Sequence, residues 1–395
     1  MTPMILVVLG VALAWVGART IRLPLGLEDR LRDRTEGLSV RGDPVISVLI
    51  PVRNEAAKIE RCIRSVVAQD HAPLEIVVVN DGSTDDTPAI LDRLQRELPE
   101  ARLRILHVER TPPGWTGKNW AMQVGSQELR GAWVLQIDGD VVLAPDALRR
   151  ALTLAQHEND DLVSLLSTLE VETLAERLFH LPVPLFALLF NNLAAVNDPL
   201  SPKMFVNGQF ILYRSDRLAG LGGYAVIAGE VADDIAIGRL FQRAGRRVRV
   251  LFGQEYVSTR MYETLPAIWR GWSKFLYNGL FLNVPNVALC VARILGIFVV
   301  PPAVLAVALI AAVWAPQSLP LALLAGASAA VSVFVYLVWR DLCTSLRGSQ
   351  AIFLAYPVSA LFFICLLVHS SYRIVTRRGV EWKGRIYFSE AGVIK

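Results

Sequence analysis

The chain has 395 residues, a hydrophobic fraction of 53% and a mean hydropathy of +0.41. The length allows one large domain plus additional segments, and the hydropathy excludes a wholly soluble protein. The net charge of +4 does not indicate a nucleic-acid partner. Its basic residues cluster beside apolar segments, where anionic lipid headgroups attract them.

The first predicted element is an apolar segment at the amino terminus. Met4 to Ala18 is almost unbroken apolar sequence, and five arginines follow it between residues 19 and 34. A secretory signal peptide is also apolar, but here no basic region precedes the segment and no clear small-residue cleavage site follows it. We therefore expect residues 1–20 to be an uncleaved transmembrane anchor, with its basic flank in the cytoplasm.

Residues 43–275 carry charges throughout and alternate between strand-like and helix-like patterns. The predicted strands are Val45–Ile50, which Pro51 ends, then Glu75–Val79, Leu103–Val108 and Trp133–Ile137. The predicted helices are Ala56–Ala68, one opened by Asp85-Asp86-Thr87-Pro88, Asn119–Leu129, and one from about Pro145. This alternation predicts an α/β fold with a mainly parallel sheet and flanking helices.

Polar clusters follow three of these strands. They are Pro51 to Glu55, Asp81, and Asp138-Gly139-Asp140. Ligands of parallel sheets bind beyond the carboxyl ends of the strands, so we expect the three clusters to lie together. Two carboxylates one residue apart can point to the same side of a sheet and suit a Mg²⁺ or Mn²⁺ ion shared with a substrate's phosphates. Asp-Gly-Asp is also ordinary turn chemistry.

The carboxyl-terminal part of the chain turns apolar after about residue 284. Three segments are each close to the ~20 residues that cross a bilayer; they are Ile294–Trp314, Leu319–Trp339 and Ala351–Ser370. Pro301-Pro302 should kink the first of them. We therefore expect membrane segments within residues 276–372, followed by a basic juxtamembrane tail, 373–395.

Charge around these segments constrains the topology. The loop Arg340–Arg347 and the tail are both basic, which favours a cytoplasmic location for each, as for the domain 43–275. Three full spans would place the tail on the opposite side from that domain. We expect one segment to be re-entrant or interfacial, with the last as the main candidate because it contains Pro357, His369, Ser370 and Ser371. The sequence predicts a multi-pass protein of the cell (inner or plasma) membrane and leaves two or three carboxyl-terminal spans open.

The polar motifs, in their order along the chain, resemble family 2 glycosyltransferases, which are inverting enzymes with the GT-A (Rossmann-like) fold. The motifs are Pro51-Val52-Arg53-Asn54-Glu55, Asn80-Asp81-Gly82-Ser83-Thr84-Asp85, Gly117-Lys118, Asp138-Gly139-Asp140 and Ala232-Asp233-Asp234. The resemblance covers residues 43–275. Pro113–Ala121 and Val380–Arg385 resemble, more narrowly, the membrane-bound branch near hopanoid- and carotenoid-associated glycosyltransferases.

The resemblance implies a pocket for a UDP-sugar donor. It assigns the nucleotide to residues 51–55, which include Pro51, Arg53, Asn54 and Glu55, and the uracil to Asp81. Asp81 is otherwise an ordinary turn residue, and Asn54 and Glu55 could cap the following helix.

The same resemblance implies how the diphosphate is held. Lys118 follows a loop rich in glycine and proline, from which a lysine can reach a diphosphate as a point charge. The alternative is a solvated surface lysine. Asp138 is expected on the ribose side of the donor, and Asp140 is expected to bind Mg²⁺ or Mn²⁺.

Asp233 and Asp234 precede a helical pattern, Ile235–Phe241, that ends near Gly245. Aspartates at this position often cap a helix or interact with its dipole. The pair matches the Glu-Asp pair of the family, with Asp233 in place of the Glu. The resemblance therefore implies that Asp234 is the general base for the acceptor and that Asp233 supports it.

The acceptor side carries weaker signals. Gln209 lies in a stretch that resembles the family's acceptor-side loop, although an ordinary strand-loop residue fits equally well. Leu178–Ala195 is either a core helix or a membrane-lying segment that guides a lipid acceptor. Trp272 and Lys274 are candidate acceptor residues, and Trp272 is also typical of an interfacial aromatic.

Processive relatives carry a Gln-x-x-Arg-Trp motif, whereas this chain reads Ile268-Trp269-Arg270-Gly271-Trp272. That departure argues against a processive polysaccharide synthase, which remains the main alternative. A non-catalytic transporter or scaffold is less expected, because no charged residue lies in the middle of the last two apolar segments. We expect a metal-dependent enzyme that moves one sugar to a hydroxyl or carboxyl of a lipid or isoprenoid acceptor.

Overall fold

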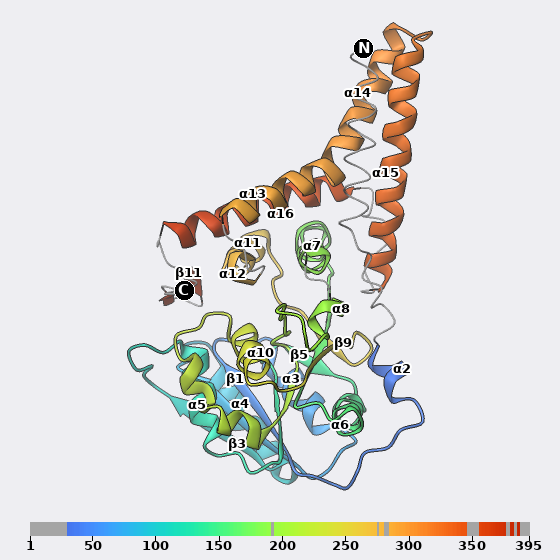
Figure 1. The fold of residues 1–395 in the computed structure, drawn as a ribbon. Coiled ribbons are helices and arrows are strands. Elements are labelled where there is room, and N and C mark those ends of the chain that lie inside the picture. The colour runs from blue at the N-terminus through green and yellow to red at the C-terminus, as the bar shows by residue number, and fades with distance from the viewer. Residues whose placement is uncertain are drawn as a thin grey trace. The chain divides into compact units, whose positions relative to one another are not determined.

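The computed structural model describes residues 30–190, 193–274, 276–279, 284–345, 355–376, 380–382 and 385–387. They form two compact units (Figure 1). The sheet unit contains the described residues of 26–170 and 193–261, with the short hairpin β11 (Val380–Trp382) and β12 (Arg385–Tyr387). The helical unit contains those of 171–190 and 262–376. The predicted anchor, 1–20, lies outside the described residues.

The sheet unit is built around a seven-stranded sheet with the order β3-β2-β1-β4-β8-β6-β9. Its strands are β1 Ile46–Val52, β2 Leu74–Asp81, β3 Leu103–Val108, β4 Trp133–Gln136, β6 Leu162–Leu166, β8 Ile211–Arg214 and β9 Val248–Phe252. The first four pair in parallel, and β8 runs antiparallel to β4 and β6. The expected mixed, mainly parallel sheet is therefore confirmed. Strand order reverses between β1 and β4, which is where α/β sheets bind ligands.

The prediction that Pro51 ends the first strand is wrong, because β1 continues to Val52. β1 pairs with β4 only as far as Leu49, whose carbonyl accepts a hydrogen bond from the Ile137 N–H at 3.2 Å. Alternation along the strand places the Pro51 nitrogen on this same side, one step beyond the last paired residue. The missing N–H therefore costs no ladder hydrogen bond.

Helices pack along the sheet. They include α3 Ile59–Val67, α4 Thr87–Glu97, α5 Gly117–Ser126, α6 Ala147–Glu158, α9 Ser215–Gly220 and α10 Asp233–Arg243, with short turns α2 Leu31–Thr35, α8 Leu193–Val196, η1 Pro99–Ala101 and η3 Gly223–Ile227. The buried residues of α3 are Ile59, Cys62, Ile63 and Val66, the spacing that predicted this helix. A smaller sheet joins β5 (Val141–Leu143), β10 (Val257–Thr259) and β7 (Thr168–Leu169).

The helical unit contains the apolar part of the chain. Its elements are the π-helical turn η2 (Glu176–His180), α7 Pro182–Phe190, α11 Leu265–Ser273, α12 Leu276–Gly279, α13 Val284–Ile294, η4 (Leu295–Val299), α14 Val300–Trp314, α15 Leu319–Ser345 and α16 Tyr356–Val375. The buried Phe186 ring lies 4.8 to 5.1 Å from the rings of Phe298, Trp339 and Phe363. Within Leu178–Ala195, α7 is therefore a core helix of this unit.

Among the described residues, three stretches of helix are long and apolar enough to cross a membrane: Val284–Trp314, Leu319–Leu337 and Tyr356–Val375. The predicted kink at Pro301-Pro302 is confirmed. The π-helical turn η4 interrupts the first stretch, and the prolines stand in the opening turn of α14. Figure 1 shows the resulting change of direction between α13 and α14.

Candidate functional site

The loops that follow β1 and β2 are tied together by hydrogen bonds. The Asn54 N–H donates to Ser83 Oγ at 2.9 Å, and the Thr84 N–H donates to Asn54 Oδ1 at 2.7 Å. Arg53 Nη1 donates to the Asp81 carbonyl oxygen at 2.5 Å and lies 4.0 Å from Asp81 Oδ2. Two of the three predicted polar clusters therefore meet at the carboxyl edge of the sheet.

The interpretation of Asn54 and Glu55 as helix caps is wrong. The residue at the N-cap of α3 is Lys58, and no side chain caps that end of the helix. Asn54 instead adopts a left-handed conformation with φ 52°, and the Glu55 carbonyl accepts hydrogen bonds from Lys58 and Ile59. These residues shape the loop rather than end the helix.

Asp81 is 3% exposed beside Arg53. Its carboxylate is therefore largely shielded from solvent. The role of Asp81 in holding uracil therefore remains a prediction.

The Asp138-Gly139-Asp140 triplet forms the turn between β4 and β5. The Val141 N–H donates to the Asp138 carbonyl at 3.2 Å. A Cβ atom placed on Gly139 would lie 2.9 Å from Val52 Cγ1 and 3.5 Å from Glu55 Cγ. The turn therefore packs directly on the end of β1 and has no room for a side chain at its centre.

Gly139→Ala should destabilise the protein and disturb the turn that carries both aspartates. We expect the free energy of unfolding to fall by about 1–3 kcal/mol, the usual cost of overpacking, as measured in urea. The matched control is Gly220→Ala, because a Cβ there meets nothing within 4 Å. Equal stability of the two variants would contradict the tight packing of the turn.

Carboxylates gather beside the amino end of α3. Burial raises the pKa of the Cys62 thiol, and the charges of Asp140, Asp138 and Glu55 raise it further. Cys62 Sγ also lies 3.6 Å from the Asp138 carbonyl oxygen, to which it donates. The turn after β4 and the loop after β1 therefore bring three acidic side chains within electrostatic range of Cys62.

Lys118 joins two of the predicted acidic motifs. It lies in the first turn of α5, whose N-cap residue Thr116 accepts a hydrogen bond from the Asn119 N–H. Its Nζ is 2.8 Å from Asp138 Oδ1 and 3.0 Å from Asp233 Oδ2. Burial acts to lower the pKa of Lys118, but the charges of Asp138 and Asp233 outweigh it and raise the pKa above its ordinary value. The interpretation of Lys118 as a solvated surface lysine is therefore wrong.

A buried polar network continues from Asp233. Gln136 Nε2 donates to Asp233 Oδ2 at 3.2 Å, and the Tyr224 hydroxyl donates to Gln136 Oε1 at 3.1 Å. The Tyr213 and Tyr224 hydroxyls lie 2.7 Å apart, and all three of these polar residues are at most 1% exposed. Gln136 is not among the predicted site residues, although a glutamine in an otherwise apolar strand two residues before Asp138 is a usable signal.

Asp234 does not cap α10, because Ala232 occupies the N-cap position. Its Oδ2 accepts a hydrogen bond from the Gly208 N–H at 3.1 Å, and its Oδ1 accepts one from the Ile235 N–H at 2.8 Å. Burial and then the charge of Asp233 raise the pKa of Asp234 from its ordinary 3.8 to about 6, against the opposing charge of Lys118. A carboxylate with such a pKa can accept a proton near neutral pH.

The predicted acceptor residues belong to two different units, Gln209 to the sheet unit and Trp272 and Lys274 to the helical unit. Gln209 is buried in the sheet unit, where its side-chain oxygen accepts from Ser167 Oγ and Asn207 Nδ2 and its Nε2 lies 3.1 Å from Met261 Sδ. Protein partners therefore use both ends of its amide, as expected for a structural residue.

Trp272 and Lys274 belong to the helical unit. The Trp272 ring is 6% exposed and packs edge-on against His180 and Tyr262, at centroid distances of 5.7 and 6.4 Å. Lys274 follows directly at the end of α11. An acceptor role for either residue remains a prediction.

The acidic side chains fit an ion shared with a ligand. Among the described residues, no group of three or more His, Cys, Asp or Glu side chains could hold a metal ion by itself. Asp138 and Asp140 supply hard carboxylate oxygens from one turn. Mg²⁺ is usually bound by one or two carboxylates together with water and substrate phosphates. The pair therefore suits a divalent ion that also contacts a diphosphate.

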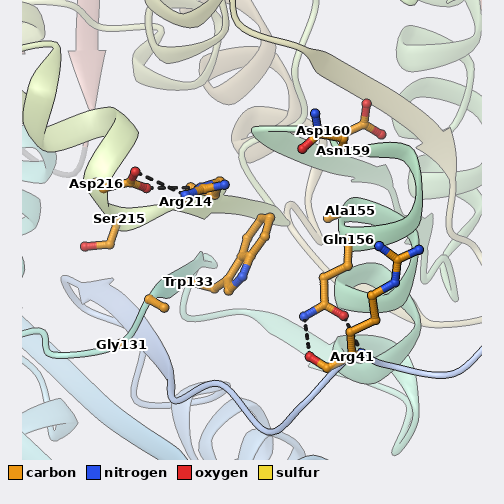
Figure 2. Close-up of a pocket in the computed structure, with 11 residues that line it drawn as sticks. Arg41, Gly131, Trp133, Ala155, Gln156, Asn159, Asp160, Arg214, Ser215 and Asp216 are labelled. Carbon is orange, nitrogen blue, oxygen red and sulfur yellow. Dashed lines mark hydrogen bonds and ion pairs between the residues drawn. The ribbon is translucent and has the colours of Figure 1, made fainter.

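A separate hollow of about 630 Å³ lies at the opposite edge of the sheet (Figure 2). Trp133 at the start of β4 and Arg214 at the end of β8 line it, and the antiparallel pairing of these strands brings both to that edge. Arg214 pairs with Asp216 at 3.1 Å and Asp160 with Arg249 at 2.6 Å, whereas Arg41 lies 3.4 Å from His157 Nδ1. The predicted site residues Lys118, Asp138 and Asp233 lie at the other edge.

Comparison with known proteins agrees with this fold and motif order. The sequence matches the profile of Glycosyl transferase family 2 over residues 47–214 and that of Glycosyl transferase family group 2 over residues 133–369, more than half of the chain. It is 24% identical to a 4,4'-diaponeurosporenoate glycosyltransferase of Staphylococcus aureus over 87% of this chain and 88% of that protein. It is also 33% identical to the succinoglycan biosynthesis protein ExoO of Rhizobium meliloti, over 31% of this chain and 35% of that protein.

The fold also resembles that of a solved structure. It is the mannosyltransferase PcManGT of Pyrobaculum calidifontis in complex with GDP-Man and Mn²⁺, with a TM-score of 0.52 and 19% identity. The similarity covers 93% of this chain and 98% of that one. The order of the motifs, the GT-A-like sheet and the profile that spans most of the chain agree, and the protein is a member of glycosyl transferase family 2.

Proposed function

We propose that the protein is a membrane-bound, inverting glycosyltransferase that moves one sugar from a UDP-sugar to a hydroxyl of an apolar lipid or isoprenoid acceptor. The observation that carries this proposal is the position of Lys118. Its ammonium group contacts Asp138 on the donor side and Asp233 beside the candidate base. The residues proposed to bind the leaving diphosphate and the residue proposed to deprotonate the attacking hydroxyl thus lie at the same edge of the sheet.

The donor side consists of the strand-end loops. Pro51, Arg53, Asn54 and Glu55 line the nucleotide, with Asp81 near the base and Asp138 near the ribose. An ammonium group has three N–H donors, and the carboxylates that Lys118 contacts among the described residues are Asp138 and Asp233. A donor therefore remains for a phosphate oxygen, where it stabilises the charge that develops as the diphosphate leaves.

Asp140 would hold a Mg²⁺ or Mn²⁺ ion, which supplies positive charge to the leaving diphosphate when bound. This assignment is supported by the carboxylate oxygen donors of the turn, which suit a hard divalent ion. A solved fold neighbour contains Mn²⁺.

The acceptor side depends on Asp234. The acceptor oxygen attacks the anomeric carbon opposite the diphosphate, so that a new carbon–oxygen bond forms as the bond to the phosphate oxygen breaks. The hydroxyl proton passes to the Asp234 carboxylate. Gly208 and Ile235 orient that carboxylate through their N–H groups, while Gln136 and Lys118 contact the neighbouring Asp233 and fix its position.

A carboxyl acceptor is the second candidate, because the Staphylococcus aureus relative is named for a carboxylate, 4,4'-diaponeurosporenoate. Carboxylates have a pKa near 4 and need no general base at neutral pH. An anionic acceptor would instead be repelled by ionised Asp234 and Asp233. The two acceptor chemistries therefore differ in how the rate depends on pH.

With a hydroxyl acceptor, kcat/KM should rise with pH through about 6, the pKa of Asp234. The base must be unprotonated to act, so we expect a roughly tenfold fall for each pH unit below that value and a plateau above it. A carboxyl acceptor should give the opposite trend, with the rate falling above pH 6. Rates measured between pH 4.5 and pH 8.5 separate these outcomes.

The membrane location is supported by the candidate spans and their flanking arginines. We place the sheet unit in the cytoplasm of a multi-pass protein of the inner or plasma membrane, because basic loops favour that side. Nucleotide sugars would meet the donor site there.

The proposal is tested by supplying membranes that contain the protein with radiolabelled UDP-sugars, one at a time, and extracting them with organic solvent. We expect one sugar to yield organic-soluble label that requires Mg²⁺ or Mn²⁺. GDP-mannose belongs in the panel as the donor of the fold neighbour. Label found only in a large aqueous polymer would replace the proposal with the processive synthase.

A further inference from the structure

A row of exposed apolar side chains runs along the whole of α16. Its members recur every three or four residues, so they lie on one side of the helix. They are Val358, Leu361, Cys365, Val368, Tyr372 and Val375. Each of the five apart from the cysteine is 45–54% exposed. We refer to this row as the α16 stripe.

The opposite side of α16 is packed against the helical unit. Ser359, Phe363 and Ser370 are at most 2% exposed. Ser359 Oγ donates to the Leu178 carbonyl at 2.8 Å, and Ser370 Oγ accepts from the Tyr277 N–H at 3.2 Å. Two serines of this helix therefore face inward and find partners there, while its outward row is mainly apolar.

Lipid is the surrounding that suits this stripe. If α16 faced water, a continuous apolar row along its 20 residues would be exposed to solvent. Soluble monomers rarely expose an apolar surface of this kind. The helices that precede α16 expose apolar side chains in the same way, including Val307 at 66% and Val313 at 77% in α14 and Leu319 at 68% in α15. The stripe therefore continues the lipid-exposed surface of the candidate spans.

The direction of α16 decides how it meets the lipid. α14 and α15 form a hairpin joined by the turn Ala315–Ser318, and Figure 1 shows α16 running across the direction of this hairpin. Parallel helices look parallel from every viewpoint, so α16 is not parallel to α14 and α15. The three helices therefore cannot all lie along the membrane normal. Transmembrane helices tilt by up to about 40°. More of α16 is also buried in the protein, 39% against 17% and 11% for the other candidate spans.

The charges agree with an in-plane helix. Arg340 is exposed near the end of α15, and Arg373 lies in the last turn of α16. A spanning α16 would separate these arginines across the membrane. An in-plane α16 leaves both on one face, where anionic headgroups attract them.

We infer that α16 lies in the plane of the membrane surface with the α16 stripe at the boundary between headgroups and acyl chains, and that α14 and α15 are the crossings among the described candidate spans. Helices of this kind bury their apolar side about 5–10 Å below the headgroups. The tail after α16 then lies on the same side as the start of α14. This arrangement does not depend on the chemistry proposed above.

The test measures the depth of nitroxide labels in the full-length protein in vesicles of phosphatidylcholine with about one-third phosphatidylglycerol, since anionic lipid favours the arginine contacts. Single reporter cysteines at Val358, Leu361, Val368 and Tyr372, and the native Cys365, sample the stripe. In this background Cys343 is replaced by serine, as is Cys365 in every variant except the one that reports from Cys365 itself. Cys62 and Cys290 are at most 3% exposed and stay unlabelled.

The α14 helix provides the matched control. Reporter cysteines at Val300, Val307 and Val313 should show the profile of a crossing, with Val307 deepest. We expect the five stripe positions to share one shallow depth. A label at Cys365 that lies deeper in the membrane than the labels at Val358 and Tyr372 would overturn the proposal. Stripe labels that are accessible only to water-soluble reagents would overturn it as well.

A second measurement determines on which side of the membrane two sites outside α16 lie, and needs no substitution within α16. A cysteine at Ser318, in the turn between α14 and α15, and an epitope tag after Lys395 are probed in sealed vesicles with impermeant reagents. We expect the tag to share a side with the sheet unit and Ser318 to lie on the other side. A tag on the Ser318 side would establish three crossings and overturn the inference.

Discussion

Asp234→Asn should abolish sugar transfer while leaving nucleotide binding largely intact. An amide cannot accept the acceptor's proton, and removing a general base usually costs 10²–10⁴-fold, so we expect a loss of about 10³-fold in kcat. The carboxamide oxygen can still accept one of the two backbone hydrogen bonds, from Gly208 or Ile235. Transfer is measured with the identified donor, and binding with UDP and Mn²⁺ by calorimetry.

This variant should also keep its stability. The pKa of Asp234 is raised in the folded protein, so its contribution to stability is complete below its ordinary value of 3.8 and is lost as pH rises through about 6. At neutral pH the charged form adds no electrostatic stabilisation that the amide would lose. Asp216→Asn is the matched control, because Asp216 lies in the first turn of α9 and is largely exposed. Loss of UDP binding in Asp234→Asn would reassign the residue to the donor pocket.

Lys118→Met should have the second largest effect. The change removes the cation between Asp138 and Asp233, leaving both carboxylates without their ammonium partner. We expect transfer to fall by about 10²–10³-fold, as for loss of a group that stabilises developing charge. The free energy of unfolding should fall by about 1–3 kcal/mol, because buried acceptors lose their partner.

Lys118→Met should also shift the pH dependence of kcat/KM. Lys118 lowers the pKa of Asp234, so its removal should move the rise in kcat/KM to a pH above 6. Lys118→Arg restores the charge and should return the midpoint towards 6. Lys203→Met, at an exposed lysine of the same unit, controls for loss of charge alone. An unchanged midpoint in Lys118→Met would show that Lys118 does not influence the ionisation of the candidate base Asp234.

Much of the sheet could be predicted because local patterns and tertiary structure agree there. The β3 strand has the predicted bounds, Leu103–Val108, and the buried face of α3 follows the predicted spacing. The strand-end rule also brought the polar loops to one edge. The Pro51 prediction failed because it required knowing that β4 stops pairing at Leu49, which is a property of the sheet and not of the strand.

The site was predictable in its residue types but not in its contacts. The link from Lys118 to Asp233 joins residues 115 positions apart, and no periodicity reports such a distance. Gln136, Tyr213 and Tyr224 read as ordinary strand and loop residues, although they form the buried support for Asp233. Helix caps were assigned to acidic residues by propensity, whereas the loops after the strands determine where α3 and α10 begin.

The anomeric configuration of the purified lipid product tests the central claim most directly. Direct attack on the anomeric carbon, with Asp234 as base and the diphosphate as leaving group, inverts that centre. Proton NMR of the product should therefore show the configuration opposite to that of the sugar donor. A product that retains the donor's configuration would contradict single displacement at this site and require a covalent or front-face mechanism instead.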